Sequence, residues 1–422
     1  MTFSINQRTL ILGCSLLVIA ASCLLMARTA SADNAPTTQP DLAMQPAPVL
    51  SPPPTQYADD KRVFQGIPSI ESAPHGRLWA TWYGGGPGEG PFNYIMLATS
   101  ADQGKTWSNV KLVIDPAGDV RAFDPCIWLD PTGKMWLTWA QGWSHWDGRG
   151  GVWAITTTDS DNENPKWSEP TRLFDGVMMN KPVVLTTGEW VFPGCVWNRD
   201  ADKRPAGQTW NVPADRFSTL MVTSDQGKTF AVLGRPDVPK RTFDEHMLIE
   251  RRDGSLWTLV RTTYGIGQSV STDHGKTWSP GAGSGISSPS TRFFIRRLAS
   301  GKLLLVRNAP PPPSKNRSNL TASLSDDDGK TWSSGIDLDV RNSVSYPDAT
   351  QAADGTIYVI YDYSRTGDKT ILMAAITEAD IEAGKIVSPN GRLQMLVNQA
   401  TGVRSKPAAA ATKPAKAPPT AP

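Results

Sequence analysis

Six short polar turns, each ending in glycine and followed by an apolar run, recur along the chain. Successive turn glycines lie 47 to 66 residues apart, and each run is rich in β-branched or aromatic residues. The glycines are Gly76, Gly133, Gly188, Gly254, Gly301 and Gly355. A period of this size built from β-hairpins is typical of radial repetition about a central axis. We therefore predict an all-β fold, a six-bladed β-propeller with four-stranded antiparallel blades spanning residues 60–400.

Composition excludes some classes of function. The 422 residues carry a net charge of +2 and no basic stripe, so we expect no nucleic-acid partner. Only four histidines occur, and none shows the His-x-x-x-His spacing of a zinc site, so we expect neither a metal nor a cofactor. Sixteen tryptophans suit packing between blades and a surface on which carbohydrate stacks.

The N-terminus has the pattern of an export signal. Arg8 precedes an apolar stretch at 10–27, and Ala30-Ser31-Ala32 forms a small-residue cleavage site. Residues 1–32 are thus predicted to be a signal peptide, and the protein to be periplasmic, cell-surface or secreted. The stretch is long enough that an uncleaved signal anchor stays open, and only then would the chain touch a membrane.

Two further segments have biased composition. Residues 33–59 are rich in Pro, Ala, Thr and Gln and predict an extended linker, whereas residues 401–422 predict a disordered Ala/Pro/Lys tail. Cys126 and Cys195 remain once a signal is removed. They could pair, but sequence does not show whether they meet.

A second repeat is a loop of the form Ser/Thr-x-Asp-x-Gly-Lys-Thr-Trp/Phe. Four copies occur, at 100–107, 223–230, 271–278 and 325–332. The Asp accepts hydrogen bonds from its own turn and the Gly supplies a positive φ. These loops are Asp-boxes, and from about Phe64 to Leu396 the chain resembles the sialidase (neuraminidase) superfamily of six-bladed propellers. Because Asp-boxes also occur in non-enzymatic propellers, we interpret them as structural turns.

The strand before each hairpin glycine should be the innermost of its blade and line the axis. Nine residues before the six glycines stand Ile67, Asp124, Met179, Glu245, Arg292 and Tyr346. Two acids, an arginine and a tyrosine on one axis indicate an active-site mouth. The alternative is that these groups hydrogen-bond one another across a wet channel. Arg261 and Arg317 should face the same mouth, and several guanidiniums in one cavity imply an anionic ligand.

The resemblance gives these residues roles. Sialidases carry a Glu on an inner strand and an Arg at the end of the next strand, as in Glu245 and Arg261. They place a further Arg before the Asp-box of the penultimate blade, as in Arg317. A Tyr opens their last inner strand, as in Tyr346. The resemblance implies Tyr346 as nucleophile, Glu245 as its base, and Arg261 and Arg317 as clamps for a substrate carboxylate. The anomeric carbon of sialic acid bears a carboxylate, which would repel a carboxylate nucleophile but not a neutral phenol. Sialidases are accordingly an exception to the rule that glycosidases use two carboxyl groups.

The pattern departs from the family at two places. Gly66 stands where the first-blade Arg of a three-Arg clamp is expected, and Arg292 could supply that charge from another blade. The expected general-acid Asp is also absent from the loop after the second strand of the first blade. Glu89 in that loop and Asp124 on the neighbouring inner strand are rival acids.

We therefore expect an exported, retaining exo-glycosidase that cleaves a terminal acidic sugar, sialic acid in the first instance, from a glycan. One alternative is a non-catalytic glycan-binding Asp-box propeller. Another is a glycosidase or lyase that acts on a different acidic polysaccharide. Sequence does not give the oligomeric state.

Overall fold

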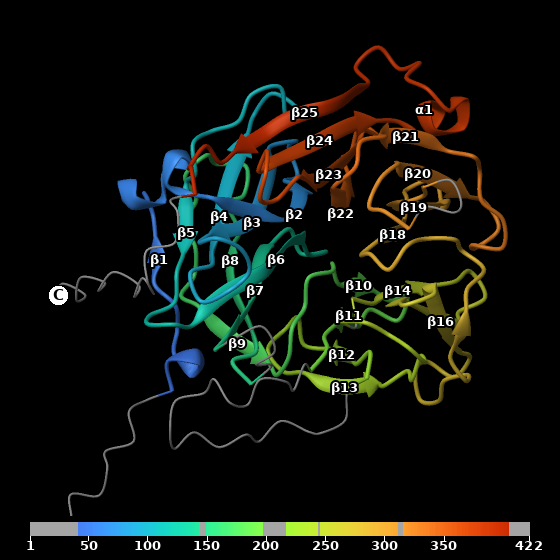
Figure 1. Cartoon of the computed structure of the whole chain (residues 1–422). Coiled ribbons are helices and arrows are strands. Elements are labelled where there is room, and N and C mark those ends of the chain that lie inside the picture. Colours follow the sequence, from blue (N-terminus) through green and yellow to red (C-terminus); the bar gives the residue numbers. More distant parts are fainter. Residues whose placement is uncertain (1–40, 144–148, 197–216, 244, 311–314, 405–422) are drawn as a thin grey trace, which may run out of the picture. The chain divides into compact units, whose positions relative to one another are not determined.

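The computed structural model describes residues 41–143, 149–196, 217–243, 245–310 and 315–404. These residues form six antiparallel sheets arranged as the blades of a propeller, with the innermost strands around a common centre (Figure 1). The predicted fold is confirmed. The predicted signal peptide at 1–32 and most of the predicted tail lie outside the described residues. No helix of the described part is long and apolar enough to cross a membrane.

The first three blades follow one another along the chain. Each is given from its innermost strand outward, and the first has five strands rather than the predicted four. Blade one comprises β2 (Phe64–Ser72), β3 (Leu78–Gly85), β4 (Tyr94–Ser100), β5 (Leu112–Ile114) and β1 (Val49–Leu50). Blade two comprises β6 (Arg121–Leu129), β7 (Met135–Gly142), β8 (Val152–Thr157) and β9 (Thr171–Phe174). Blade three comprises β10 (Val183–Val184), β11 (Trp190–Pro193), β12 (Leu220–Thr223) and β13 (Ala231–Gly234).

The last three blades have four strands each, and the last inner strand contacts the first, which closes the ring. Blade four comprises β14 (Met247–Glu250), β15 (Leu256–Thr262), β16 (Gly265–Ser271) and β17 (Ala282–Gly283). Blade five comprises β18 (Phe294–Arg297), β19 (Leu303–Asn308), β20 (Leu320–Ser325) and β21 (Ile336–Asp339). Blade six comprises β22 (Val344–Gln351), β23 (Ile357–Tyr363), β24 (Thr370–Ile376) and β25 (Arg392–Gln399), with the short helix α1 (Glu378–Ala383) before its outer strand.

The repeat glycines form the turns that join each inner strand to the next. All six have positive φ, between 80° and 97°, which a side chain would strain. The Asp-boxes form the predicted hydrogen-bonded turns near the outer ends of the blades. In one of them the hydroxyl and amide of Thr331 donate to Asp327 and hold the pKa of that exposed carboxyl at about 2. These aspartates are structural, as predicted.

Aromatic side chains fill the spaces between neighbouring blades. The Trp128 indole of blade two meets Trp190 of blade three edge-on, with ring centroids 5.2 Å apart. Both residues belong to one buried cluster that also takes in Phe174 and Phe192. Such interlocking fixes the angle between blades, so the inner strands hold their polar ends in fixed positions around the axis.

The segment at 41–59, part of the predicted linker, packs on blade one instead. It forms 3-10 helices at Leu42–Met44, Thr55–Tyr57 and, continuing past it, Asp59–Lys61, and β1 pairs with β5. The Tyr57 side chain is buried, and its hydroxyl donates to Asp115 at 2.8 Å. Pairing of β1 covers the outer edge of the blade, which would otherwise expose unpaired backbone groups. Cys126 and Cys195 are both buried thiols with no disulfide between them, so the possible pairing is not formed.

Candidate active site

A cavity of about 200 Å³ lies among the starts of the inner strands. It is lined by Ile67, Tyr83, Glu89, Arg121, Phe123, Asp124, Met179, Phe243, Glu245, Arg261, Arg317, Tyr346 and Arg365. Six of the seven site residues predicted from the sequence are among these, and Arg292 is the exception. These six predicted residues come from five of the six blades and meet in one small cavity.

Three of the lining residues are presented by the same local device. Ile67, Asp124 and Tyr346 each precede a proline, have φ near +50° and sit at a bulge in their inner strand. A β-bulge turns the affected side chain away from its regular direction, and left-handed φ in such residues stores strain of about 1–3 kcal/mol. The repeated X-Pro bulge therefore turns side chains that would face a neighbouring blade into the cavity.

Tyr346 occupies the centre of this constellation. Its hydroxyl donates to Glu245 Oε1 over 3.4 Å, and its ring lies 5.0 Å below the guanidinium of Arg317 and 5.0 Å from that of Arg365. Burial, reinforced by the negative charge of Glu245, raises the pKa of the phenol above its usual value. The phenol is therefore protonated near neutral pH, and it needs a base to become a nucleophile.

Glu245 is bound from its other side by Arg261. Nη1 of Arg261 lies 2.8 Å from both carboxylate oxygens, and both side chains are buried. The guanidinium also stacks on Phe243 at 4.8 Å. Arg261 lines the cavity as predicted, but its nearest anion is Glu245, so its first role in the structure is to position and neutralise that carboxylate.

Asp124 faces the same cavity from blade two. Burial raises its pKa to about 8, against the opposing field of Arg121. The Arg121 guanidinium packs 4.0 Å from the Phe123 ring. Near neutral pH the Asp124 carboxyl is therefore protonated and able to donate a proton, as a general acid must.

Glu89, the rival acid, has different surroundings. It lies at the rim on a loop that follows β3, is partly exposed, and accepts a hydrogen bond from Arg365 Nη1 at 2.7 Å. An arginine partner favours the ionised carboxylate. Of the two predicted acids, Asp124 is the one whose pKa burial raises, which favours the protonated carboxyl that a general acid needs.

Sequence reasoning missed two arginines of the cavity lining, Arg121 of β6 and, at a place that no local pattern marks, Arg365. Arg365 follows β23 in blade six, and its side chain crosses Gly66 of blade one. A Cβ on Gly66 would lie 2.3 Å from Arg365 Cδ and 2.6 Å from its Cγ. The side chain of Arg365 thus fills the space beside Gly66, where the family pattern predicts an arginine. Only the absence of a side chain at Gly66 would have indicated it.

Arg292 does not reach the cavity. Its side chain is fully buried and donates to Asn180 at 2.7 Å and to the Met179 carbonyl at 3.1 Å, with Asp348 3.5 Å away. Arg292 lacks the positive φ of Ile67, Asp124 and Tyr346, and it is followed by Phe293 and not by proline. The prediction that Arg292 replaces the first-blade arginine is therefore wrong, because Arg292 links inner strands below the cavity.

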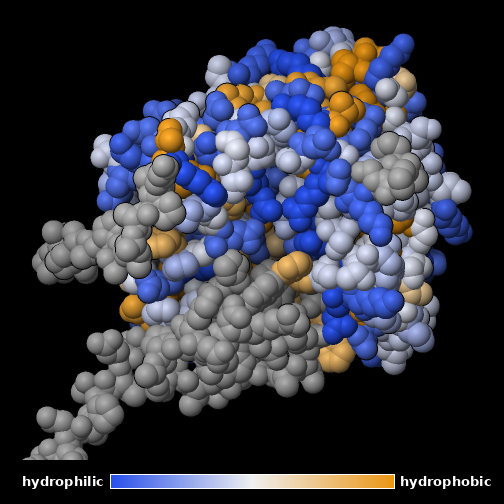
Figure 2. All heavy atoms as spheres, viewed as in Figure 1, coloured by the Kyte–Doolittle hydropathy of each residue, from blue (hydrophilic) through white to orange (hydrophobic). Residues whose placement is uncertain are grey.

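A wider groove of about 820 Å³ adjoins the cavity and shares Glu89, Arg317 and Arg365 with it. Most of its other walls come from polar residues of blades five and six, including Asn342, Ser343 and Ser364, and blade one adds Phe64 and Gly88. Hydrophilic residues gather around the middle of the face shown in Figure 2. A small inner cavity with a polar outer groove suits a terminal sugar with the rest of a glycan outside it.

Comparison with known proteins agrees with this geometry. The family model described as BNR repeat-like domain matches residues 76–359. The chain belongs to that family. A sialidase from Bacteroides fragilis is 25% identical over 314 residues, which cover 64% of this chain and 54% of that protein. The chain spans about half the length of that curated relative.

Solved structures with the same fold include several sialidases. The Hadza microbial sialidase Hz136 superposes with a TM-score of 0.59 at 19% identity, covering 76% of this BNR-repeat chain and 67% of its own. The NanB sialidase from Streptococcus pneumoniae gives 0.55 at 15% identity, covering 77% and 70%. A protein of unknown function from Dyadobacter fermentans gives 0.57 at 14% identity, covering 76% and 95%. At these identities the likeness shows the fold, which is that of sialidase-like propellers.

Proposed function

We propose that this protein is a retaining exo-glycosidase that releases a terminal sialic acid from glycans, with Tyr346 as the nucleophile. The observation that carries the proposal is the buried Tyr346 hydroxyl, which donates to Glu245 while Arg317 and Arg365 flank its ring. The sialidase relative and the matching propellers support the class of reaction.

The charge of the cavity favours an anionic sugar. Four guanidiniums line it, those of Arg121, Arg261, Arg317 and Arg365. They face the carboxylates of Glu89 and Glu245, because Asp124 is held neutral. Arg261 donates to Glu245, and one nitrogen of Arg365 donates to Glu89. Arg317 and the other nitrogens of Arg365 are therefore placed to bind a substrate carboxylate. A planar guanidinium matches a carboxylate with two parallel hydrogen bonds.

In the first step Glu245 accepts the Tyr346 proton and the phenol oxygen bonds to the anomeric carbon. The glycosidic bond breaks, and the leaving oxygen takes the proton of Asp124. In the second step Asp124 takes a proton from water, which attacks the same carbon. The bond to Tyr346 breaks, and the phenol oxygen recovers its proton from Glu245. Two displacements at one carbon retain the anomeric configuration.

The field of the cavity makes the phenol a usable nucleophile. Burial and Glu245 raise the pKa of Tyr346, whereas Arg317, Arg261 and Arg365 act in the opposite direction. Transfer of the proton to Glu245 puts negative charge on a phenolate whose charge the fields of three nearby guanidiniums favour, so it is stabilised by groups already in place. The leaving group needs a proton, and the Asp124 carboxyl can donate one because its raised pKa keeps it protonated near neutral pH.

The test is hydrolysis of a fluorogenic aryl sialoside by the wild-type chain and by Tyr346→Phe. The matched control is Tyr361→Phe, which also removes a buried phenol hydroxyl, one that donates to Asp339 away from the cavity. We expect loss of turnover by about 100-fold or more in Tyr346→Phe and little change in the control. Unchanged turnover in Tyr346→Phe would refute the phenol nucleophile. Turnover of an aryl uronide in place of the sialoside would refute sialic acid, and glycan binding without turnover of either would identify a lectin-like propeller.

We also propose export, on the basis of Arg8, the apolar stretch and the small-residue cleavage site. The mature N-terminus of the protein recovered from a cell able to export it tests this. Asp33 as first residue supports a cleaved signal, and a chain retained whole in the cytoplasm contradicts export.

A further inference from the structure

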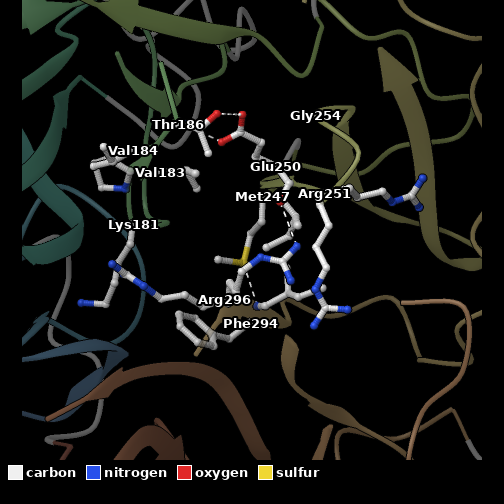
Figure 3. A pocket seen from close by; sticks show the side chains of 15 residues that line it. Lys181, Val183, Val184, Thr186, Met247, Glu250, Arg251, Gly254, Phe294 and Arg296 are labelled. Carbon is white, nitrogen blue, oxygen red and sulfur yellow. Dashed lines mark hydrogen bonds between the residues drawn. The ribbon is translucent and has the colours of Figure 1, made fainter. Parts of the chain in front are cut away.

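We propose a second anion-binding site, for a small carboxylate with an apolar body, at the opposite end of the propeller axis. A cavity of about 470 Å³ lies there, lined by residues of β10, β14, β18 and the hairpin turn at Gly254 (Figure 3). Strand β14 shows the relation between the two sites. Glu245, just before its start, lines the candidate active site, whereas Glu250, its last residue, lines this cavity.

Buried ion pairs separate the two cavities. Lys181 Nζ donates to the Ile70 carbonyl at 2.7 Å and to Glu71 at 3.1 Å, and lies 3.4 Å from Asp348. Arg292 lies on the other side of Asp348 at 3.5 Å. All four charged side chains are buried. The core of the axis is thus filled by paired charges, and a ligand in the far cavity is distinct from a substrate in the mouth.

The far cavity is strongly basic. Its lining includes five cationic side chains and one carboxylate, that of Glu250. Glu250 is engaged by the amide and hydroxyl of Thr186, both at 2.7 Å. The five cations are Lys181, Arg251, Arg252, Arg296 and Arg297. The lining of the far cavity therefore carries more positive than negative charge.

Three of these cations, Arg251, Arg252 and Arg296, have no ion pair with a described residue, and the guanidinium of Arg252 donates to backbone carbonyls instead. Lys181 has Glu71, and Arg297 has Asp328 at 2.8 Å. For Arg251 and Arg296 the described residues provide no ion pair, and one buried guanidinium nitrogen of each, Arg251 Nε and Arg296 Nη1, has no hydrogen-bond partner there. A buried donor without an acceptor is costly, and an anion with oxygen acceptors would remove that cost.

Arg296 is the better head-group site of the two. It also lines an adjoining cavity of about 250 Å³, so its side chain is reached from both hollows. The Lys181 ammonium is close enough to interact with the Arg296 charge, but Glu71 and Asp348 already balance it, so Arg296 provides the unpaired positive charge here. Arg251 instead stacks on the Trp257 indole at 4.4 Å. In Figure 3 it lies across the cavity from Lys181, with Met247 and Phe294 between them.

The remaining walls select the body of the ligand. They are apolar and come from three blades, and they include Val183, Met247, Ile249, Phe294 and Ile295. A fully hydrated ion such as sulfate would gain nothing from them, whereas an aryl or alkyl group would bury apolar surface. A planar carboxylate on such a group matches the guanidinium of Arg296. The volume is that of a small organic ligand.

The test is titration calorimetry of the full chain with 3-phenylpropionate and with its neutral amide, 3-phenylpropionamide. We expect one site for the acid and binding of the amide at least about tenfold weaker, the loss of a charged hydrogen bond. Arg296→Met should weaken acid binding by at least about tenfold and Arg251→Met by two- to threefold, because it acts at longer range. Arg252→Met is the matched control, since its guanidinium donates to backbone carbonyls of Asp326 and Gly301 at the rim.

Arg317→Met separates this site from the mouth and should leave acid binding unchanged. Equal binding of acid and amide, full binding by Arg296→Met, loss of binding in Arg317→Met, or no saturable binding up to on the order of 10 mM would each overturn the proposal. If Arg296→Met does not fold, Arg296→Lys keeps the charge, and the comparison of acid with amide needs no variant. None of these outcomes depends on sialidase activity.

Discussion

Adding one methyl group at Gly66, which does not itself line the cavity, should weaken substrate binding by displacing Arg365, which does. The new Cβ would lie 2.3 Å from Arg365 Cδ and 2.8 Å from Asp362 Oδ2, whereas ordinary contacts begin near 3.4 Å. Arg365 must therefore move by about 1 Å or more, and its guanidinium leaves the position from which it faces a substrate carboxylate. Hydrogen bonds of a charged donor contribute about 1.5–3 kcal/mol, so Gly66→Ala should lower kcat/KM by about 10- to 150-fold.

The loss should appear mainly in KM, because a carboxylate clamp holds ground state and transition state alike. Arg365→Met should have a similar effect, and the double variant should be little worse than either single one, since both changes remove the same contact. Gly66→Arg combined with Arg365→Met should recover part of the loss by restoring an arginine at the family's position.

The assay is steady-state hydrolysis of an aryl sialoside, with a thermal melt of each variant to exclude unfolding. Gly90→Ala is the matched control, because a Cβ there meets nothing within 4 Å and should change kcat/KM by less than about twofold. Normal kcat/KM in Gly66→Ala, or losses that add in the double variant, would refute the link between Gly66 and Arg365.

Three other predictions concern Asp124 and Arg261. Asp124→Asn should lower turnover of a sialyllactose by about 100-fold or more but spare an aryl sialoside, whose leaving group needs no proton; equal losses on both substrates, or a selective loss in Glu89→Gln instead, would contradict Asp124 as the acid. Since burial raises the pKa of Asp124 to about 8 and the protonated form is the active one, kcat/KM for sialyllactose should fall as the pH rises through about 8; a fall on the alkaline side centred near pH 4–5 would contradict the assignment. Arg261→Met leaves the buried Glu245 charge unpaired and should cost about 3–5 kcal/mol in urea unfolding, with partial recovery in the Arg261→Met/Glu245→Gln double variant; a single variant as stable as wild type would show that the pair is not needed.

The position of the site could be predicted from the sequence because a propeller repeats. An offset from the hairpin glycine selects Asp124, Glu245 and Tyr346, and the inner strands bring them to one cavity. The same offset misplaced Arg292, because bulges with positive φ occur at Ile67, Asp124 and Tyr346, where a proline follows, and not at Arg292. Strand periodicity alone does not predict which inner strands have a bulge.

Other features depend on contacts between residues far apart in the chain. Arg365 belongs to a loop after β23 and reaches the cavity only by crossing Gly66 of blade one, so no local pattern marks it. The segment before blade one has a linker's composition, yet it is ordered by the free edge of β5 and by the Tyr57 hydrogen bond to Asp115. The pKa of Asp124 likewise arises from burial that only the closed ring creates.

Covalent trapping tests the role of Tyr346 most directly. A 2,3-difluorosialic acid has a reactive fluoride at the anomeric carbon, and its second fluorine slows release from the enzyme. Attack by the phenol oxygen would displace fluoride and leave one fluorosialyl group on the protein. We predict a single adduct by intact mass, located by peptide mass spectrometry on Tyr346 and absent from Tyr346→Phe. An adduct on another residue, or turnover of a sialoside by a chain that forms no adduct at all, would contradict a tyrosine nucleophile.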